Sequence, residues 1–562
     1  MFSATAALLT LTYPGAEYLH PTIHFTPDYV SNVGGWHDVA GALTHKGVHH
    51  VFQGTGWNHA KSSDLVRWSM APHGPKKIHE TYKGMISYSD PCSGFLTKDP
   101  DDGGRVCAGF RQCGSNKGVV GMPHNWDVPL ELRCAVDDDL NAFNDSAPEY
   151  LFNVSFWRAV PYDPARPWRE PDDGHWYVLL SFDACNATAH PHGCAAGGML
   201  GMWRSPALRG SAANWVHVGD VFTSNVTVLQ DGHLTKEFVT IDYIGKLPND
   251  PKPEGLGTRI FLNNVGGNGG GVGCCSGTTS YFVVEQEAAG APLKEVAPQG
   301  MVDWGAFRLK TPAPPTTTSR ATEVEETATR ARLDLLDGTG SRGLSMARTL
   351  GSEEADQVTQ PGRRVLIGWT GPADVHQLGG QGSAQSLPRE LSLAPDRSLL
   401  QAFVPELQAL RIAPPHAASG ASAWFPTNVG LQAEVIASLP GKACAAAHAG
   451  CGVALLEDEL GATIVTLDAS RGLVLVDAKS QSNTAVRAGP LPPMREGAVG
   501  WTIHAIVDHS LVEVIVNNAT ALVVYAAPSS ANAGRVRLVG APEDAKSASI
   551  VAWRLKGAGH EY

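Results

Sequence analysis

The chain has 562 residues and a formal net charge of -12, from 43 Lys and Arg against 55 Asp and Glu. With 43% hydrophobic and 17% charged residues it can build large cores, which excludes global disorder, a collagen-like chain and a small disulfide scaffold. The acidic balance argues against a protein that coats nucleic acid, because such proteins need cations to displace phosphate counterions. At roughly 150 residues per domain, the length predicts two to four domains.

The N-terminal region and the cysteines favour the secretory pathway. Residues 1–20 start with the apolar MFSATAALLTLT and are either a possible signal remnant or an N-terminal extension. The ten cysteines include the close spacings Cys185/Cys194 and Cys444/Cys451, which are typical of small disulfide loops. Asn-x-Ser/Thr sequons occur at Asn144, Asn153, Asn186, Asn225 and Asn518. We therefore expect a secreted or vacuolar protein, and no membrane span, because no run reaches the required length of about 18 to 20 apolar residues.

Short apolar runs bounded by Gly, Pro, Asn or Asp recur along the first two thirds of the chain. Examples are Val48–Gln53, Trp176–Phe182 and Tyr281–Glu285, which are rich in β-branched or aromatic residues and have the length of a strand. Long helical periodicity is nearly absent, and 61 Gly and 38 Pro interrupt the pattern throughout. This combination predicts an all-β protein built as a propeller, a barrel or a sandwich.

The composition changes between residues 309 and 363. Pro312–Ser319 (PAPPTTTS) precedes a charged stretch rich in Ala and Thr that can bury little, so we predict a low-complexity surface insertion within one domain. Farther along, Trp501–Asp508 and Leu511–Asn517 alternate apolar and polar residues, as strands do when one face covers a core. This alternation predicts a β-sandwich over residues 412–562.

A series of motifs runs the length of the chain. In order, they are His24–Pro27 (HFTP), Gly35–Asp38 (GWHD), Trp57–Trp68 (WNHAKSSDLVRW), Tyr162–Trp168 (YDPARPW), Val302–Phe307 (VDWGAF), Ser386–Leu391 (SLPREL) and Val507–Val514 (VDHSLVEV). Their joint order and spacing resemble glycoside hydrolase family 32, the invertase and fructanase family. The resemblance implies a five-bladed β-propeller over residues 21–411, followed by the β-sandwich.

The chemistry implied by this resemblance depends on carboxylates. Cleavage of a fructosidic bond needs one group to protonate the leaving oxygen and another to attack the anomeric carbon, about 5 to 5.5 Å apart in retaining enzymes. By resemblance, Asp38 is the nucleophile, Asp163 stabilises the transition state by binding fructosyl hydroxyls, and Glu237 is the acid/base. Each also fits a plainer role, Asp38 and Asp163 as turn residues and Glu237 as a surface or salt-bridged residue.

All three catalytic motifs depart from the family pattern. His37 replaces the usual Asn before the nucleophile and would make hydrogen bonding there depend on pH. Tyr162 replaces the Arg before Asp163, which removes a fixed cation. Two additional residues separate Glu237 from Asp242, which resembles the Asp that follows the acid/base, and the motif's Cys is missing.

Further substrate contacts follow from the resemblance. The implied substrate-binding residues are Trp36, His37, Gln53, Trp57, Asp90 and Tyr162. Trp57 could stack on a sugar ring or pack in the core, and Arg158 or Arg166 could replace the cation missing beside Asp163. We expect no cofactor and no metal, because two carboxylates suffice. A zinc site at Cys185, His190, His192 and Cys194 is less economical than a Cys185–Cys194 disulfide.

The sequence therefore predicts a retaining glycoside hydrolase that cleaves terminal β-fructofuranosidic bonds of sucrose or fructans. Its partner would be a small carbohydrate and not a nucleic acid. A catalytically silent or carbohydrate-binding member of the same fold, and a fructosyltransferase, remain open alternatives. A propeller glycosidase acting on arabinosides is a further alternative, against which the Ser386–Leu391 and Val507–Val514 motifs argue.

Overall fold

The computed structural model describes most of the chain. The described residues are 19–26, 38–54, 57–71, 78–82, 85–114, 129–144, 149–153, 161–183, 198–224, 238–245, 247, 249–251, 256–266, 277–305, 307–309, 333–335, 344–351, 362–370, 384–420, 428–447, 450–478, 486–494, 497–540 and 547–561.

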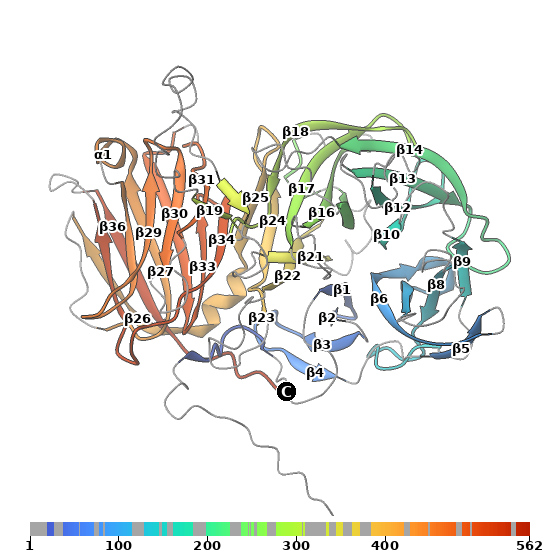
Figure 1. Ribbon diagram of the computed structural model, residues 1–562, viewed down its shortest axis with the longest axis horizontal. Coiled ribbons are helices and arrows are strands. Elements are labelled where there is room, and N and C mark those ends of the chain that lie inside the picture. The colour runs from blue at the N-terminus through green and yellow to red at the C-terminus, as the bar shows by residue number, and fades with distance from the viewer. Residues whose placement is uncertain are drawn as a thin grey trace, which may run out of the picture.

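Five antiparallel sheets, blades I to V, surround one axis in the centre and right of Figure 1. Blade I contains β1 (Val39–His45), β2 (Val48–Gln53), β3 (Asn58–Ser62) and β4 (Ser69–Ala71). Blade II contains β5 (Ile78–Tyr82), β6 (Met85–Asp99), β7 (Arg105–Gly114), β8 (Pro129–Cys134) and β9 (Glu149–Asn153). Blade III contains β10 (Pro161–Pro164), β11 (Trp168–Arg169), β12 (Trp176–Asp183), β13 (Gly198–Ser205) and β14 (Val216–Ser224).

Blades IV and V complete the ring. Blade IV contains β15 (Phe238–Gly245), β16 (Thr258–Gly266), β17 (Gly277–Gln286) and β18 (Leu293–Met301). Blade V contains β21 (Leu344–Gly351), β22 (Arg364–Thr370), β23 (Ala384–Gln385), β24 (Arg389–Leu393) and β25 (Leu399–Phe403). The inner strands β1, β6, β10, β15 and β21 contact one another in a closed circle, so the edges of the blades at the axis are protected by the neighbouring blades.

The inner strands are crowded, and small residues permit their close approach. All residues of β1 are buried, and a Cβ added at Gly41 would lie 2.9 Å from Leu96 Cγ of β6. Glycine at this position lets blades I and II pack together.

Most of a β-sandwich follows the propeller, after the 3-10 helix Pro405–Leu410, and two short strands from residues 307–335 join it from earlier in the chain. Its six-stranded sheet has the order β26 (Arg411–Ser419), β36 (Ser549–Leu555), β27 (Gln432–Pro440), β32 (Gly500–Asp508), β33 (Leu511–Val516) and β34 (Thr520–Tyr525). Its seven-stranded sheet has the order β20 (Leu333–Leu335), β19 (Phe307–Leu309), β31 (Arg487–Pro490), β30 (Leu473–Ala478), β29 (Thr463–Asp468), β28 (Cys451–Glu457) and β35 (Arg535–Val539). A short helix, α1 (Gly441–Ala446), follows β27.

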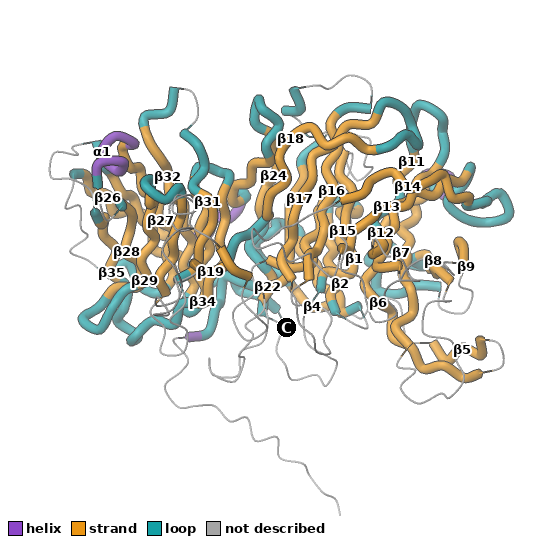
Figure 2. The backbone as a smooth tube through the Cα atoms, turned by 45° about the horizontal axis from the view of Figure 1, so that its top comes forward, coloured by secondary structure: helices purple, strands orange, loops and turns teal. Residues whose placement is uncertain are grey.

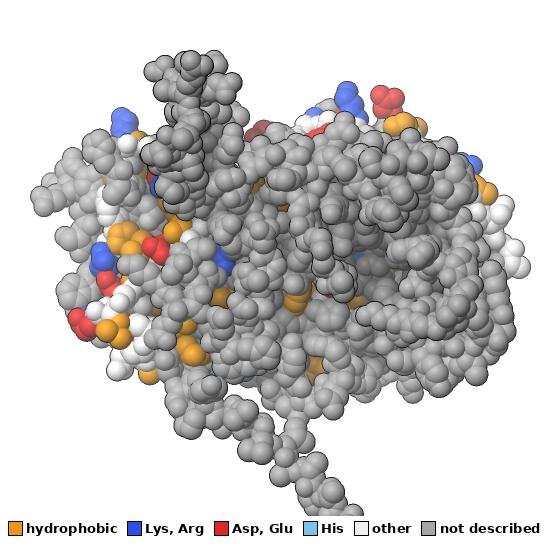
Figure 3. Space-filling model, in the orientation of Figure 1, with side chains coloured by type: hydrophobic (Ala, Val, Ile, Leu, Met, Phe, Trp, Pro, Cys, Tyr) orange, Lys and Arg blue, Asp and Glu red, His pale blue; other side chains and the backbone are white. Residues whose placement is uncertain are grey.

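The sandwich core consists of apolar residues from both sheets. In β35 buried and half-buried residues alternate, which places Val536 and Leu538 in the core, where they join Val453, Val514 and Ile550. Figure 2 shows the strands of the sandwich on one side of the molecule and the propeller strands on the other. In Figure 3, the described side chains on the visible face of the sandwich mix hydrophobic and charged groups.

The predicted insertion over residues 309–363 needs correction. It includes β20, which extends the seven-stranded sheet of the sandwich, and β21, which is the inner strand of blade V. The rest of the predicted insertion, apart from residues 309, 362 and 363, lies outside the described residues. The composition misled the prediction because β21 (LSMARTLG) carries small and polar residues suited to the crowded axis and lacks a strand's alternation.

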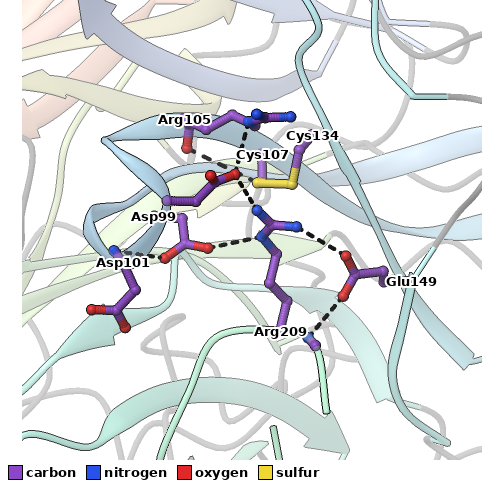
Figure 4. Close-up of a disulfide and its surroundings, with 9 residues drawn as sticks. Asp99, Asp101, Arg105, Cys107, Cys134, Glu149 and Arg209 are labelled. Carbon is purple, nitrogen blue, oxygen red and sulfur yellow. Dashed lines mark hydrogen bonds and ion pairs between the residues drawn. A yellow bond between two sulfur atoms is a disulfide. The ribbon is translucent and has the colours of Figure 1, made fainter. Parts of the chain in front are cut away.

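Two disulfides are present among the described residues. Cys444–Cys451 confirms the predicted small loop, whereas Cys185 and Cys194 lie outside the described part. The second disulfide, Cys107–Cys134, joins neighbouring strands of blade II and was not predicted. Beside it, Arg209 of blade III binds three carboxylates of blade II (Figure 4), with its Nε 2.8 Å from Asp99 Oδ2 and its Nη1 3.0 Å from Glu149 Oε1.

Replacing both Cys107 and Cys134 by Ser should lower the free energy of unfolding by about 3.5 kcal/mol in the chain-entropy estimate, because the cross-link closes a loop between residues 27 apart. The measurement is the denaturation midpoint without reductant. The matched control is the Cys444/Cys451 pair, only 7 residues apart, whose replacement should cost less. Equal shifts for the two pairs would contradict the loop-length explanation.

Candidate active site

Asp38 lies at the entrance to the innermost strand of blade I. It immediately precedes β1, and the residue is only 6% exposed. Its backbone carbonyl accepts a hydrogen bond from Gly54 N at 3.0 Å, and Val39 pairs with Gln53 across β1 and β2. This hairpin therefore brings two of the predicted site residues, Asp38 and Gln53, to the same end of the neighbouring strands β1 and β2.

Gln53 is fully buried and is oriented by a residue from blade V. Its Nε2 donates to Gln385 Oε1 at 3.3 Å. Its Oε1 has no hydrogen-bond partner among the described residues, although it is buried. The amide nitrogen is therefore hydrogen-bonded and the amide oxygen is not, which suits this oxygen to accept a hydrogen bond from a ligand hydroxyl.

Other predicted residues are described only at the level of the backbone. Asp163 and Tyr162 belong to β10, the inner strand of blade III, and Asp90 belongs to β6, the inner strand of blade II. Trp36, His37 and Glu237 lie outside the described residues. Phe238, which follows Glu237 in the sequence, is the first residue of β15, the inner strand of blade IV.

Trp57 lies in the core between blades I and II. Its side chain is fully buried, and its ring lies 5.7 Å from that of Phe52 and 5.5 Å from that of Phe110. Leu96 and Phe143 belong to the same cluster. Because its ring packs against these aromatic and apolar neighbours, a packing role is favoured for Trp57 over stacking on a sugar.

Arg166 and Asp242 connect the inner strands by polar contacts at the axis. Arg166 Nη2 donates to the carbonyl oxygens of Ala42 in β1 and Thr349 in β21, both at 2.7 Å, and its Nε lies 3.8 Å from Asp242 Oδ1. Asp242 Oδ2 accepts from Thr349 N at 2.9 Å and from Thr349 Oγ1 at 2.7 Å. These contacts give Arg166 a part in joining blades I, III, IV and V, beyond the compensating cation suggested by the sequence.

Replacing Asp242 by Asn should lower the free energy of unfolding by about 1–3 kcal/mol, because an amide nitrogen would face donors of Thr349 in a buried site. Asp250 provides a matched control, because it accepts from Thr258 N at 2.9 Å and from Thr258 Oγ1 at 2.8 Å within blade IV, where Thr258 begins β16. Denaturation midpoints of Asp242→Asn and Asp250→Asn should differ, with the larger shift for Asp242. A shift confined to Asp250→Asn would show that the axis contacts do not hold the ring.

A group of buried charges links the propeller to the sandwich. Asp508 Oδ2 accepts from His24 Nδ1 at 2.8 Å, and Glu513 Oε1 lies 3.1 Å from His24 Nε2. Glu513 Oε2 and Asp303 Oδ2 both pair with Arg389 Nη2, at 2.7 and 3.0 Å. All five side chains are fully buried.

These five residues lie in four of the motifs that resemble family 32, but no role was predicted for them. The motifs HFTP, VDWGAF, SLPREL and VDHSLVEV converge on this one buried network. The available signal was a set of charged residues within apolar, strand-like segments, since charged side chains are almost never fully buried unless paired.

The sequence matches no family model, and no curated protein matches it. Its fold is nevertheless that of the family 32 glycoside hydrolases, a five-bladed propeller followed by a sandwich. The GH32 β-fructofuranosidase BmSUC1 of Bombyx mori superposes with a TM-score of 0.65 at 18% identity, covering 97% of this chain and 95% of that one. Fructan 1-exohydrolase IIa of Cichorium intybus has a TM-score of 0.65 at 15% identity, with coverage of 97% and 99%. Exo-inulinase of Aspergillus awamori has a TM-score of 0.66 at 18% identity, with coverage of 96% and 99%.

This similarity confirms the predicted all-β fold class and the fold that the family resemblance implied, a five-bladed propeller followed by a sandwich. At these identities it establishes the fold, and the roles of individual residues stay predictions. Within the described segments, no group of three or more His, Cys, Asp or Glu side chains is arranged to hold a metal ion. The helices of the described part include none long and apolar enough to cross a membrane.

Proposed function

We propose that this protein is a glycoside hydrolase that cleaves terminal β-fructofuranosidic bonds of sucrose or fructans with retention of configuration. The observation that carries the proposal is the position of Asp38, buried beside Gln53 at the start of the innermost strand in a chain with the fold of β-fructofuranosidases. Blades I, III and IV each begin at their inner strand, so the first residues of β1, β10 and β15 are expected at the same end of the ring. Asp38, Asp163 and Glu237 belong to or directly precede these strands.

The mechanism follows from the chemistry of two carboxyl groups. The Asp38 carboxylate attacks the anomeric carbon of the fructosyl unit while the Glu237 carboxyl protonates the departing oxygen, and the glycosidic bond breaks. Glu237, now ionised, removes a proton from water, whose oxygen displaces Asp38 and releases fructose. Asp163 holds fructosyl hydroxyls through hydrogen bonds that strengthen in the oxocarbenium-like transition state. Two displacements at one carbon leave its configuration unchanged.

Related structures support a fructoside as the ligand. A single-residue mutant of BmSUC1 is in complex with sucrose, and a single-residue variant of the Cichorium intybus fructan 1-exohydrolase IIa is in complex with 1-kestose. Two disulfides and an exposed sequon asparagine, Asn144, support a secretory destination. Trp36, His37, Asp90 and Tyr162 remain proposed sugar contacts beside Gln53.

The test is incubation of the purified protein with sucrose, inulin and levan, followed by measurement of released fructose. In the presence of methanol, a retaining enzyme should form the methyl β-fructofuranoside, which distinguishes retention from inversion. Transfer to a second sugar would identify a fructosyltransferase, which uses the same covalent intermediate. Sugar binding without any turnover would overturn the proposal in favour of the silent, carbohydrate-binding alternative, which the altered residues His37 and Tyr162 keep open.

A further inference from the structure

Glu513 of the sandwich fixes a segment of blade V. Its Oε1 accepts a hydrogen bond from Leu387 N at 2.8 Å, and its Oε2 binds Arg389 Nη2 at 2.7 Å and Arg389 Nε at 3.2 Å. Figures 1 and 2 place β22 of blade V between the sandwich and blade I. One carboxylate of the C-terminal domain thus holds the chain on the C-terminal side of Gln385.

Asp508 fixes a second segment, near the N-terminus, that is hydrogen-bonded to the backbone of Gln385. Its carboxylate accepts from the backbone N–H groups of Thr22, Ile23 and His24 at 2.8–2.9 Å. One residue farther, the carbonyl oxygen of Phe25 accepts from Gln385 N at 3.0 Å. The backbone of Gln385 is therefore held between two segments that the sandwich anchors.

The side chain of Gln385 connects this anchored segment to the candidate site. Its Oε1 accepts from Gln53 Nε2 at 3.3 Å, and Gln53 pairs with Val39, the residue after Asp38. Gln53 and Gln385 are 0% and 1% exposed, so neither side chain can move without disturbing its packed surroundings. A displacement of the chain at Leu387 would consequently change the orientation of the Gln53 amide.

We propose that the sandwich contributes to substrate binding at the fructoside site. Glu513 positions Gln385, and Gln385 in turn orients the amide of Gln53 toward the sugar. Glu513 and Gln385 are positioning residues, and neither contacts the substrate. This inference rests on the proposed function only in taking Gln53 as the group that meets the sugar. It gives the C-terminal domain a role in substrate affinity as well as in stability.

The first test compares two isosteric changes in the sandwich. Glu513→Gln removes the charge that holds segment 384–389, and we expect it to raise KM for sucrose about 10-fold, because small misplacements of binding groups are costly. The matched control is Glu434→Gln, since Glu434 is also buried but binds Arg411 at 2.6 Å and His504 at 2.8 Å. Both variants should lose stability, and only Glu513→Gln should raise KM. An equal KM in both variants would overturn the inference.

A second variant tests the same contact even if Glu513→Gln folds poorly. Gln385→Leu removes the hydrogen bond to Gln53 without touching the buried charges, and it should raise KM by a similar factor. In the double variant, the effect of Glu513→Gln on KM should largely disappear, because both changes act through the same contact. Independent, multiplying effects of the two changes would show that Glu513 does not act through Gln385.

A readout without turnover separates this inference from the proposed function. In Glu513→Gln, hydrogen exchange should quicken at residues 384–389 and at β2, whereas Glu434→Gln should leave both segments unchanged. If the wild-type protein releases no fructose and this exchange pattern is still found, the proposed function fails and the positioning contact stands. Unchanged exchange at β2 in Glu513→Gln would overturn the positioning contact, whatever the activity.

Discussion

Replacing Asp38 by Asn should lower kcat for sucrose cleavage by about 10⁴-fold or more, with little change in the denaturation midpoint. An amide can neither form the covalent bond to the anomeric carbon nor stabilise its developing positive charge. The measurement is initial fructose release under saturating sucrose. A suitable control is Asp138→Asn, because the Asp138 side chain is 72% exposed and pairs with Lys46, so its loss should leave kcat within about 2-fold.

The role of Glu237 is tested by the choice of leaving group. Glu237→Gln should abolish most cleavage of sucrose, whose leaving oxygen needs a proton, and should spare the first step with an aryl fructoside, whose leaving group departs without one. Asp38→Asn should lose both activities. If Asp38→Asn keeps more than a tenth of the activity, the nucleophile is wrongly assigned, and an equal loss on both substrates for Glu237→Gln would refute its role as the acid.

Outer and central strands could be predicted from the sequence because they are long, apolar and bounded by turn residues. The predicted strand Trp176–Phe182 corresponds to β12, and the predicted strand Trp501–Asp508 corresponds to β32. The order of motifs also gave the fold class, although no single motif was decisive. These signals depend on local burial, which a strand's own residues record.

The inner strands and the contacts between domains could not be predicted in the same way. β15 (FVTIDYIG) places Asp242 on the propeller axis, where its partner Thr349 lies 107 residues away. Glu513 stands inside the apolar run LVEVIV, and its partner His24 lies 489 residues away. A sequence records that a charge is placed among apolar residues, but it does not record which distant residue neutralises that charge.

The buried network also predicts how stability depends on pH. Burial by itself lowers the pKa of His24, but hydrogen bonds and the charges of Asp508 and Glu513 outweigh it and raise the pKa from 6.5 to about 9. Burial likewise would raise the pKa of Asp508, yet hydrogen bonds from His24 hold it below its usual value. His24 is therefore expected to be cationic in the folded protein near neutral pH.

Raising the pH from 6.5 to about 9.5 should lower the free energy of unfolding by about 3 kcal/mol, through His24. Because the folded-state pKa lies above the unfolded value, this stabilisation is complete below pH 6.5 and is lost as the pH rises through about 9. Burial lowers the pKa of His49 to about 4 and that of His50 to about 3, so these residues titrate below this window. The measurement is the urea midpoint at closely spaced pH values.

The control is His24→Gln, which keeps a polar side chain but cannot change its charge. It should be less stable than the wild type at pH 6, where the wild-type cation pairs with Asp508 and Glu513, and its stability should stay level between pH 6.5 and 9.5. The two proteins should therefore approach each other in stability as the pH rises. If the wild type and His24→Gln lose stability in parallel over this range, another group titrates there and the cationic His24 does not hold the two domains together.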